Sequence, residues 1–403
     1  MAAILIFAIT YLVLAIGRLP GFRIDRTGAA IIGASFMVGV NALTLDEAYR
    51  AINFDTIILL FGMMIVVANL RLSGFFDLVA ERVAERAHSP ALLLVAIVAV
   101  AGLFSAFFVN DTMCLVLTPL VLEIAESLRR NPVPYLLAVA MAANIGSAAT
   151  ITGNPQNMMI GSFSGIPYRD FLAALGPPSL AGLGLAALLI FVVYRREFGT
   201  PQQVRVACRP VTVDRKLMWK AIAVSLGMIA TFFAGWQVPK VAIVAGALLL
   251  ITRRVHPEEI YRSIDWPLLV MFAGLFVVIA GVEKTALEAD LVSFAGSLHL
   301  DNVFLLSGFS AALSNLVSNV PAVLVFKPFV AHLANPERTW LALAMSSTFA
   351  GNLTVLGSVA NLIVIEQARR KVQIGFWEYF RVGAPLAGIT ILAGAAWIAW
   401  RLP

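Results

Sequence analysis

The 403-residue chain is poor in charged residues, cysteine and histidine, and each shortage excludes a class of protein. Only 13% of its residues are charged, against roughly a quarter in a soluble domain. Two cysteines, Cys114 and Cys208, make neither a disulfide framework nor a zinc site. No histidine precedes a glutamate, and no Gly-Lys dipeptide marks a phosphate loop. The sequence therefore argues against a membrane enzyme or an ATP-driven pump and offers no catalytic residues.

Long apolar runs are what the chain has instead. Hydrophobic residues make up 60% of it, and its mean hydropathy is +0.89. Runs of transmembrane length recur, for example 171–194, 221–238 and 382–400. The net charge of +6 comes from basic residues in the short loops between such runs, so no nucleic-acid partner is expected. The apolar stretch 1–17 lacks the basic start of a signal peptide, which favours a retained first span over a cleaved leader.

This pattern predicts an all-α integral membrane protein with ten spans and two hairpin-like segments. In the first half, spans are expected near 2–17, 28–42, 55–70, 135–160 and 171–194. In the second half, they are expected near 217–234, 238–252, 266–283, 340–365 and 380–400. The hairpins lie near 91–128, turning at 109–112, and near 303–333, turning at 318–321. Because 135–160 and 340–365 contain Gly, Thr and Asn inside apolar sequence, both spans are expected to be broken near the membrane midplane.

The two halves of the chain repeat each other. At a constant offset of 204, the residues that recur are Met141, Thr150, Gly153 and Asn157, matched by Met345, Thr354, Gly357 and Asn361. In the hairpins, Ser105, Asn110 and Pro119 are matched by Ser314, Asn319 and Pro328. Each unit has an odd number of crossings, so the second copy must be inverted relative to the first. The prediction is a first inverted repeat over 1–194, a basic cytoplasmic linker over 195–216 and a second repeat over 217–403.

Basic residues gather on one face of this predicted topology. The other face holds only Arg50, Arg169, Lys240, Lys284, Arg338 and Arg401. By the positive-inside rule the rich face is cytoplasmic. Both termini are then outside a cell inner (plasma) membrane, the first hairpin enters from the cytoplasm, and the second enters from outside.

Asp111 lies at the centre of the first apolar hairpin. It follows Phe107-Phe108-Val109, and the nearest basic residue along the chain is Arg129. An ionisable group at membrane depth is costly unless it is paired, hydrated or bound to a cation, so it indicates a functional site. Such a carboxyl could exchange a proton for Na⁺. The alternative is a structural Asp that caps the second hairpin helix.

Neutral polar residues gather at the two turns and in the two broken spans. Helix N-termini at the turns attract anions, and the preceding carbonyls can coordinate a cation, although ordinary turn chemistry also favours Asn and Ser. In the broken spans small residues can serve helix packing instead. The candidate substrate- or ion-binding residues are Ser105, Asn110, Asp111, Thr112, Thr150, Thr152, Gly153, Asn154, Asn157, Ser314, Ser318, Asn319, Asn352, Thr354, Gly357, Ser358 and Asn361. For Lys327 three roles stay open: snorkelling, pairing with an acid across the interface, or holding an anion.

The broken spans carry the motifs Ile-Gly-Ser-Ala-Ala-Thr-Ile-Thr-Gly-Asn-Pro-Gln-Asn (145–157) and Gly-Asn-Leu-Thr-Val-Leu-Gly-Ser-Val-Ala-Asn (351–361). With the two hairpins, they resemble the ion transporter superfamily of secondary permeases over nearly the whole chain. That group includes arsenite permeases, D-type sodium/proton antiporters, citrate–metal permeases and divalent anion:sodium symporters. The resemblance implies that hairpin tips and broken helices bind substrate and coupling ion, and that a transport unit moves as a rigid body.

The same resemblance implies two Na⁺ sites. One matches Ser105, Asn110 and Gly153, and the second matches Ser314, Asn319 and Gly357. In the divalent anion symporters a Ser-Asn-Thr sequence at both tips holds the substrate carboxylates. This chain has Val-Asn-Asp (109–111) and Ser-Asn-Val (318–320) instead. A dicarboxylate substrate is therefore not favoured, and the first tip is closer to the arsenite permease and sodium/proton antiporter branches.

These features together predict a secondary-active ion permease with elevator-like alternating access. The leading hypothesis is a small inorganic or organic anion coupled to Na⁺ or H⁺. The alternatives are a Na⁺/H⁺ antiporter that uses Asp111, and an arsenite or antimonite efflux permease. No cofactor is expected besides the coupling ion. The expected partners are a small ion substrate and the lipid bilayer, and a homodimer stays open.

Overall fold

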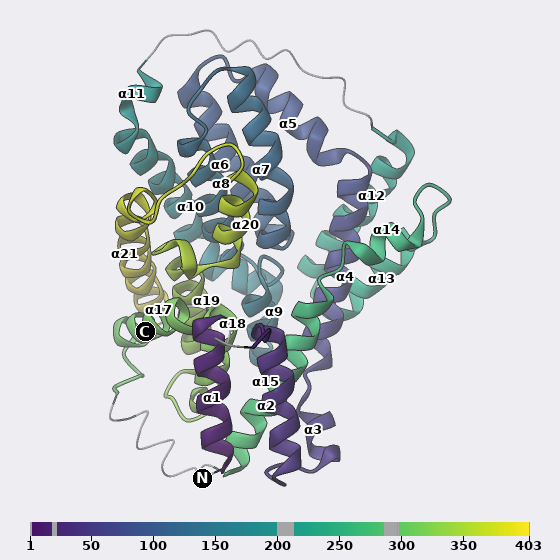
Figure 1. The fold of residues 1–403 in the computed structure, drawn as a ribbon, viewed down its shortest axis with the longest axis vertical. Helices are drawn as coiled ribbons and strands as arrows, with labels where there is room; N and C mark the ends of the chain where they lie inside the picture. The colour runs from purple at the N-terminus through teal and green to yellow at the C-terminus, as the bar shows by residue number, and fades with distance from the viewer. Residues whose placement is uncertain (1, 18–21, 200–212, 286–295, 297, 403) are drawn as a thin grey trace.

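The computed structural model describes residues 2–17, 22–199, 213–285, 296 and 298–402, and in this part of the chain the regular structure is helical, without a β-strand. The first half contains α1 (Ala2–Ile16), α2 (Arg26–Gly39), α3 (Leu45–Ala51), α4 (Phe54–Leu72), α5 (Phe75–Arg86), α6 (Pro90–Phe107), α7 (Asn110–Ser127), α8 (Val133–Ser147), α9 (Pro155–Ser164), α10 (Tyr168–Val193) and α11 (Arg195–Phe198). The second half contains α12 (Arg215–Phe233), α13 (Val238–Leu250), α14 (Pro257–Arg262), α15 (Trp266–Thr285), α17 (Val303–Val317), α18 (Asn319–Val330), α19 (Pro336–Ala350), η1 (Val355–Gly357), α20 (Val359–Ala368) and α21 (Phe376–Arg401). Figure 1 shows their arrangement.

Several helices begin at residues that satisfy the free amides of a first turn. Asn53 accepts a hydrogen bond from Thr56 N at the start of α4. Ser89 does the same for α6, where Pro90 occupies the first helical position. Asn335 caps α19 in the same way. Such caps satisfy donors that have no partner within the helix.

Six of the described helices are long and apolar enough to cross a membrane: α4, α6, α10, α12, α15 and α21. The helices on either side of the two breaks are shorter. Helix α8 has 15 residues and α9 has 10, which at 1.5 Å per residue gives about 22 and 15 Å. Neither alone spans a hydrocarbon core of about 30 Å. Helices α19 and α20 have the same lengths, 15 and 10 residues. The pairs α8–α9 and α19–α20 therefore each form one interrupted span, as the sequence predicted.

Both predicted hairpins are present as well. Helices α6 and α7 are joined at Phe108 and Val109, and helices α17 and α18 are joined at Ser318. The predicted spans coincide with helices to within a few residues, and the largest differences are at the start of α19 (Pro336), the start of α21 (Phe376) and the end of α9 (Ser164). The sequence did not predict the short helices α3, α5, α11 and α14. These lie between the spans and are short or too polar to be recognised as spans.

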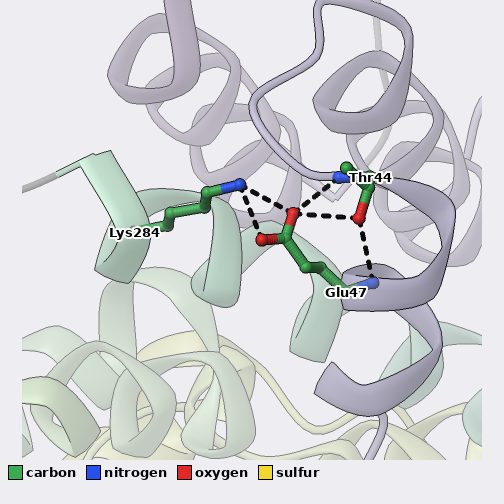
Figure 2. A network of polar contacts seen from close by, with 3 residues as sticks. All are labelled: Thr44, Glu47 and Lys284. Carbon is green, nitrogen blue, oxygen red and sulfur yellow. Dashed lines mark hydrogen bonds and ion pairs between the residues drawn. The ribbon is translucent and has the colours of Figure 1, made fainter.

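The two halves of the chain interlock. Helix α2 packs against α15, α4 against α13, and α10 against α21, so each pair joins one half to the other. At the end of α15, Lys284 donates to both carboxylate oxygens of Glu47 in α3 at 2.7 Å (Figure 2). The inverted relation of the halves and the division at 1–194 and 217–403 stay predictions. Most of the predicted linker, 200–212, lies outside the described residues.

Two groups of helices are visible in Figure 1. Helices α6, α7, α8, α10, α20 and α21 lie on one side, and α4, α12, α13 and α14 lie on the other. The hairpins and broken spans comprise α6–α9 and α17–α20. They pack against α1–α4 and α12–α15 where α9 meets α4, where α18 meets α15, and where α17 meets α1. The hairpin tips and the two breaks lie between these contacts, and this is where the candidate site forms.

Candidate functional site

A cavity of about 210 Å³ lies where the first turns of six helices converge. The helices are α2, α7, α9, α15, α18 and α20. The polar residues that line it are Arg26, Thr27, Asn110, Asp111, Gln156, Asp265, Ser318, Asn319 and Ser358. Apolar walls come from residues such as Leu14 and Met271. Side chains cap the first amides of α2, α9, α15 and α20, through Asp25, Asn154, Asp265 and Ser358. The N-termini of α7 and α18 keep free amides and partial positive charge, which favour electron-rich oxygen atoms.

The two hairpin tips are open at this cavity. Neither α7 nor α18 receives a side-chain cap at its N-terminus. The amide oxygens of Asn110 and Asn319 are buried and have no hydrogen-bond donor in the described structure. Both residues are almost fully buried, at 3% and 8% exposure. Unsatisfied buried oxygens are rare and call for a ligand, ion or water.

Asp111 supplies the carboxyl of this site. It is the second residue of α7 and is half-buried. Its side chain does not cap the helix, so the capping alternative is wrong. Within the described residues it has no hydrogen bond or ion pair, and the other acid of the cavity, Asp265, interacts with it electrostatically. An unpaired carboxyl at membrane depth, beside uncapped helix ends, indicates a functional site.

The two breaks are built alike, down to individual hydrogen bonds. The Asn157 amide donates to the carbonyls of Ser147 and Thr150, at 3.1 and 3.0 Å. The Asn361 amide donates to the carbonyls of Gly351 and Thr354, at 2.6 and 3.0 Å. All three residues of the second set lie 204 positions after those of the first. Each Asn therefore replaces the helical bonds that the break removes.

The glycine of each break is required by a close carbonyl. A side chain at Gly153 would collide with the carbonyl of Ser147. A side chain at Gly357 would meet Asn315 Oδ1 at 2.6 Å and the carbonyl of Gly351 at 3.0 Å. The Gly153 carbonyl also accepts a hydrogen bond from Asn110 N at 2.9 Å, which joins the first break to the first hairpin tip.

Asn144 joins the elements around the cavity, and the sequence did not single it out. Its Nδ2 donates to Asn352 Oδ1 at 3.0 Å and to Asn361 Oδ1 at 2.9 Å. Its Oδ1 accepts from Ser358 Oγ at 3.0 Å and from Asn110 Nδ2 at 3.3 Å. Asn144 therefore ties both breaks to the first hairpin. A single Asn in an apolar helix gave no signal that it would have four polar partners.

The remaining predicted residues lie behind the cavity wall. Thr150 donates to the carbonyl of Ala106, and Thr152 contacts the hydroxyl of Tyr168 at 2.8 Å. Asn154 Nδ2 donates to Ser147 Oγ at 3.0 Å. The other predicted residues that do not line the cavity are Ser105, Thr112, Gly153, Asn157, Ser314, Asn352, Thr354, Gly357 and Asn361. Of the predicted set, only Asn110, Asp111, Ser318, Asn319 and Ser358 face it.

Both predicted Na⁺ sites contain a buried serine hydroxyl without a hydrogen-bond partner. Ser105 and Ser314 are fully buried, and neither hydroxyl has a hydrogen-bond partner in the described structure. Together with the unsatisfied oxygens of Asn110 and Asn319, each hairpin thus holds two oxygen atoms with no partner. Neutral oxygen atoms are suitable ligands for a hard cation such as Na⁺.

Lys327 does not reach the cavity. Its ammonium pairs with both oxygens of Glu283 on α15, at 2.9 and 3.0 Å. It also lies 5.4 Å from the ring centroid of Phe163. Of the three roles left open by the sequence, the structure shows pairing with an acid, between α18 and α15.

Sequence reasoning also left out the cavity wall formed by α2 and α15. Arg26 and Thr27 begin α2, and Asp265 precedes α15. These residues looked like topology signals and loop residues, because they lie at the ends of spans. Only the fold places them opposite the hairpin tips.

Known proteins similar to this chain are transporters. The CitMHS family, described as citrate transporter, matches residues 11–350. An uncharacterized transporter of Mycobacterium tuberculosis is 33% identical over 98% of this chain and 97% of its own length. The silicon efflux transporter LSI3 of Oryza sativa subsp. japonica is 32% identical over 94% of this chain and 93% of that protein. The putative transporter arsB of Dictyostelium discoideum is 27% identical over 92% and 86%.

A solved structure shares the fold. The crystal structure of the Alcanivorax borkumensis YdaH transporter has a TM-score of 0.62 at 15% identity, covering 99% of this chain and 98% of that one. The family and its relatives are named transporters, not enzymes. The family match, the relatives and the apolar helices together show a multi-pass membrane protein. The chain belongs to the CitMHS citrate transporter family, within the ion transporter superfamily.

Proposed function

We propose that this transporter moves a small, oxygen-rich anion by secondary-active transport coupled to Na⁺ or H⁺. The observation that carries the proposal is the cavity itself, where the unpaired carboxyl of Asp111 faces uncapped helix N-termini and unsatisfied amide oxygens. Amide and guanidinium donors suit the substrate, and the carboxyl suits the coupling cation.

The substrate class follows from the donors at the cavity. The uncapped N-termini of α7 and α18 and the guanidinium of Arg26 supply positive potential, and the carboxyl groups of Asp111 and Asp265 supply negative potential. The family description names citrate, and the name of one relative specifies silicon. Citrate and the oxyacid form of dissolved silicon share several oxygen atoms that can accept hydrogen bonds. Arsenite, suggested by the superfamily resemblance, also has several such oxygen atoms. Near neutral pH arsenous and silicic acids are mostly uncharged, so citrate is the anionic member of this set.

The coupling ion acts at the first hairpin. Asp111 can carry a proton, or it can share a Na⁺ with neutral oxygens nearby. The buried hydroxyls of Ser105 and Ser314 and the amide oxygens of Asn110 and Asn319 have no partners, which supports a cation near each tip. A negative charge at only one tip makes the two positions unequal, so Asp111 is the one at which protonation changes the net charge of the site.

Transport then requires the cavity to face each side of the membrane in turn. We infer that α6–α10 and α17–α21 move together as a rigid body against α1–α4 and α12–α15, in an elevator-like step. The contacts between the two groups, α9 with α4, α10 with α12, α18 with α15 and α17 with α1, are the ones that would change. Both termini outside an inner membrane, as the charge pattern predicts, belongs to the same proposal.

The test is flux in proteoliposomes made with the purified protein, with citrate, arsenite and silicate offered separately. At least one solute is expected to accumulate when an inward Na⁺ or H⁺ gradient is imposed, and an ionophore that dissipates that gradient should abolish the accumulation. Uptake that ignores both gradients contradicts coupling. Absence of flux for all three solutes contradicts the substrate class.

Na⁺/H⁺ antiport is the second candidate, favoured by the unpaired Asp111. One measurement distinguishes the antiporter from the anion permease. An antiporter acidifies or alkalinises the vesicle lumen on addition of Na⁺ without any added anion. The anion permease shows a Na⁺-driven pH change or Na⁺ uptake only when its anion is present.

A further inference from the structure

Arg26 is the one cationic side chain among the described residues that line the cavity. It is the first residue of α2, and it lies outside both hairpins and both breaks. The acids of the cavity are Asp111 on α7 and Asp265 before α15. Among the described residues, the guanidinium of Arg26 is therefore the one positively charged side-chain group that a substrate meets in this cavity.

Contacts fix one edge of this guanidinium and leave the other open. Arg26 Nε donates to the carbonyl of Leu14 at 3.2 Å, and Leu14 also lines the cavity. Thr27 Oγ1 donates to the carbonyl of Pro267 at 3.2 Å and ties the start of α2 to the start of α15. The two terminal nitrogens of Arg26 have no acceptor among the described residues. An anchored fork with free terminal donors is suited to bind a carboxylate or another oxyanion.

A purely structural role of Arg26 does not account for its free terminal N–H groups. Capping the carbonyl of Leu14 uses only one of the five guanidinium N–H groups. A topology signal needs charge but no place in the cavity, and exposed Arg23 in the same loop already supplies that charge. Neither role requires Arg26 to line the cavity that Asn319 and Asp111 also line.

We propose that Arg26 is a specificity-determining residue whose terminal nitrogens bind an anionic oxygen of the substrate. Helices α2 and α15 then form one wall of the site, and the hairpin tips complete it. The inference rests on the proposed function, because it needs an oxygen-rich substrate in this cavity. It adds a binding group from outside the hairpins and broken helices.

The kinetic test compares Arg26→Gln, Arg26→Lys and the control Arg23→Gln, with citrate, arsenite and silicate as probes. Arg26→Gln should raise KM about 10- to 100-fold, the loss expected for a hydrogen bond to a charged group, with a much smaller change in kcat. Arg26→Lys should fall between, because it keeps the charge and loses the fork. Arg23→Gln should behave as the unaltered protein. An unchanged KM in Arg26→Gln for a transported probe overturns the inference.

A second measurement needs no substrate. In a Cys114→Ala, Cys208→Ala background, Arg26→Cys combined with Asn319→Cys should be joined by a short bifunctional thiol reagent, because both side chains face one cavity. The pair Arg23→Cys with Asn319→Cys should not be joined. Equal cross-linking of both pairs, or of neither, removes Arg26 from the cavity and overturns the inference.

The two proposals fail differently. If the unaltered protein transports none of the probes, the proposed function fails, and the cross-link still decides whether Arg26 faces the hairpin tip. If a probe is transported with the same KM by Arg26→Gln, the proposed function stands and the inference about Arg26 fails.

Discussion

The two hairpins hold matched places in the sequence, yet their tips differ in charge and in contacts. Asp111 follows Asn110 in the first, and Val320 follows Asn319 in the second. The first tip bonds to its own break through Asn110 N and the Gly153 carbonyl. Among the described residues, Asn319 N makes no matching bond. The first hairpin therefore carries the ionisable group and is tied to the broken span beside it.

The second hairpin packs on its own broken span, α19, and Asn315 Nδ2 donates to the carbonyl of Ala350 there at 2.9 Å. It also has polar contacts with α1 and α15. The hydroxyl of Tyr11 on α1 donates to the carbonyl of Pro321 at 3.0 Å. Lys327 pairs with Glu283 on α15. The first hairpin packs against α8 of its own broken span and against α5 and α20, and it has no comparable packing on α1 or α15 among the described residues. The difference suggests a division of labour in which one hairpin provides the coupling chemistry and the other provides docking.

The largest expected effect comes from removing the charge of the first tip. Asp111→Asn keeps the shape of the side chain but can no longer bind a cation or release a proton. Coupled uptake is expected to fall by about 100-fold, the scale of losing one charge-assisted interaction of roughly 3 kcal/mol. The measurement is solute accumulation in proteoliposomes under a Na⁺ or H⁺ gradient, with expression and melting temperature checked alongside.

The matched change in the second hairpin is Val320→Asn. It places the same amide at the corresponding position, so the comparison separates the charge of Asp111 from the mere presence of a polar tip. Accumulation should survive in Val320→Asn, with altered affinity at most. Wild-type accumulation in Asp111→Asn would reduce Asp111 to a structural residue and remove the proposed asymmetry.

The next largest effect is expected at Asn144, which holds both breaks and the first tip. Asn144→Ala leaves Asn352 Oδ1, Asn361 Oδ1 and the Ser358 hydroxyl without these bonds in a buried place. Each such loss costs about 1–3 kcal/mol, so the melting temperature in detergent should fall clearly. The control is Asn69→Ala, another fully buried Asn, whose amide bonds only the Ile65 carbonyl of its own helix. A drop no larger than the control's would contradict the role of Asn144 as a hub.

Asn144 also shows where prediction from the sequence stopped. The breaks could be predicted because Gly153, Gly357 and their Asn partners recur at one offset, and each has a local reason to be there. Asn144 bonds to residues more than 200 positions away, and nothing in its own helix marks it. Arg26 was missed for a similar reason. Its charge was explained by topology, whereas its place in the cavity depends on how α2 packs on α15.

A smaller effect is expected at the backbone of the second tip. Ser318 has φ +79° and ψ 159°, in a region that is essentially restricted to glycine and costs about 1–3 kcal/mol for other residues. Ser318→Gly should raise the melting temperature by relieving this strain. The matched residue of the first tip, Val109, has φ −45° and offers no such strain to relieve. Val109→Gly should therefore lower the melting temperature, and a fall in both variants would show that Ser318 is not strained.

The smallest effect concerns the end of α15, where the second hairpin docks. Glu283 pairs there with Lys327 of α18, and the next residue, Lys284, pairs with Glu47 of α3. The hydrogen bonds from Lys284 and from the Thr44 backbone N–H lower the pKa of Glu47 to about 2 (Figure 2). A depressed folded-state pKa contributes stability above the unfolded value, roughly 4.3, and that stability is lost as pH falls towards 2.

The variants Glu47→Gln and Asp46→Asn test this anchor. Asp46 lies beside Glu47 and pairs only within its helix, with Arg50. The melting temperature of Glu47→Gln should lie slightly below that of the unaltered protein from pH 8 to pH 5, and the gap should close below about pH 4 as Glu47 takes up its proton. Asp46→Asn should show a smaller gap at every pH. A gap for Glu47→Gln that is the same at pH 3 and pH 7 would mean that the ion pair with Lys284 does not hold α15 to α3.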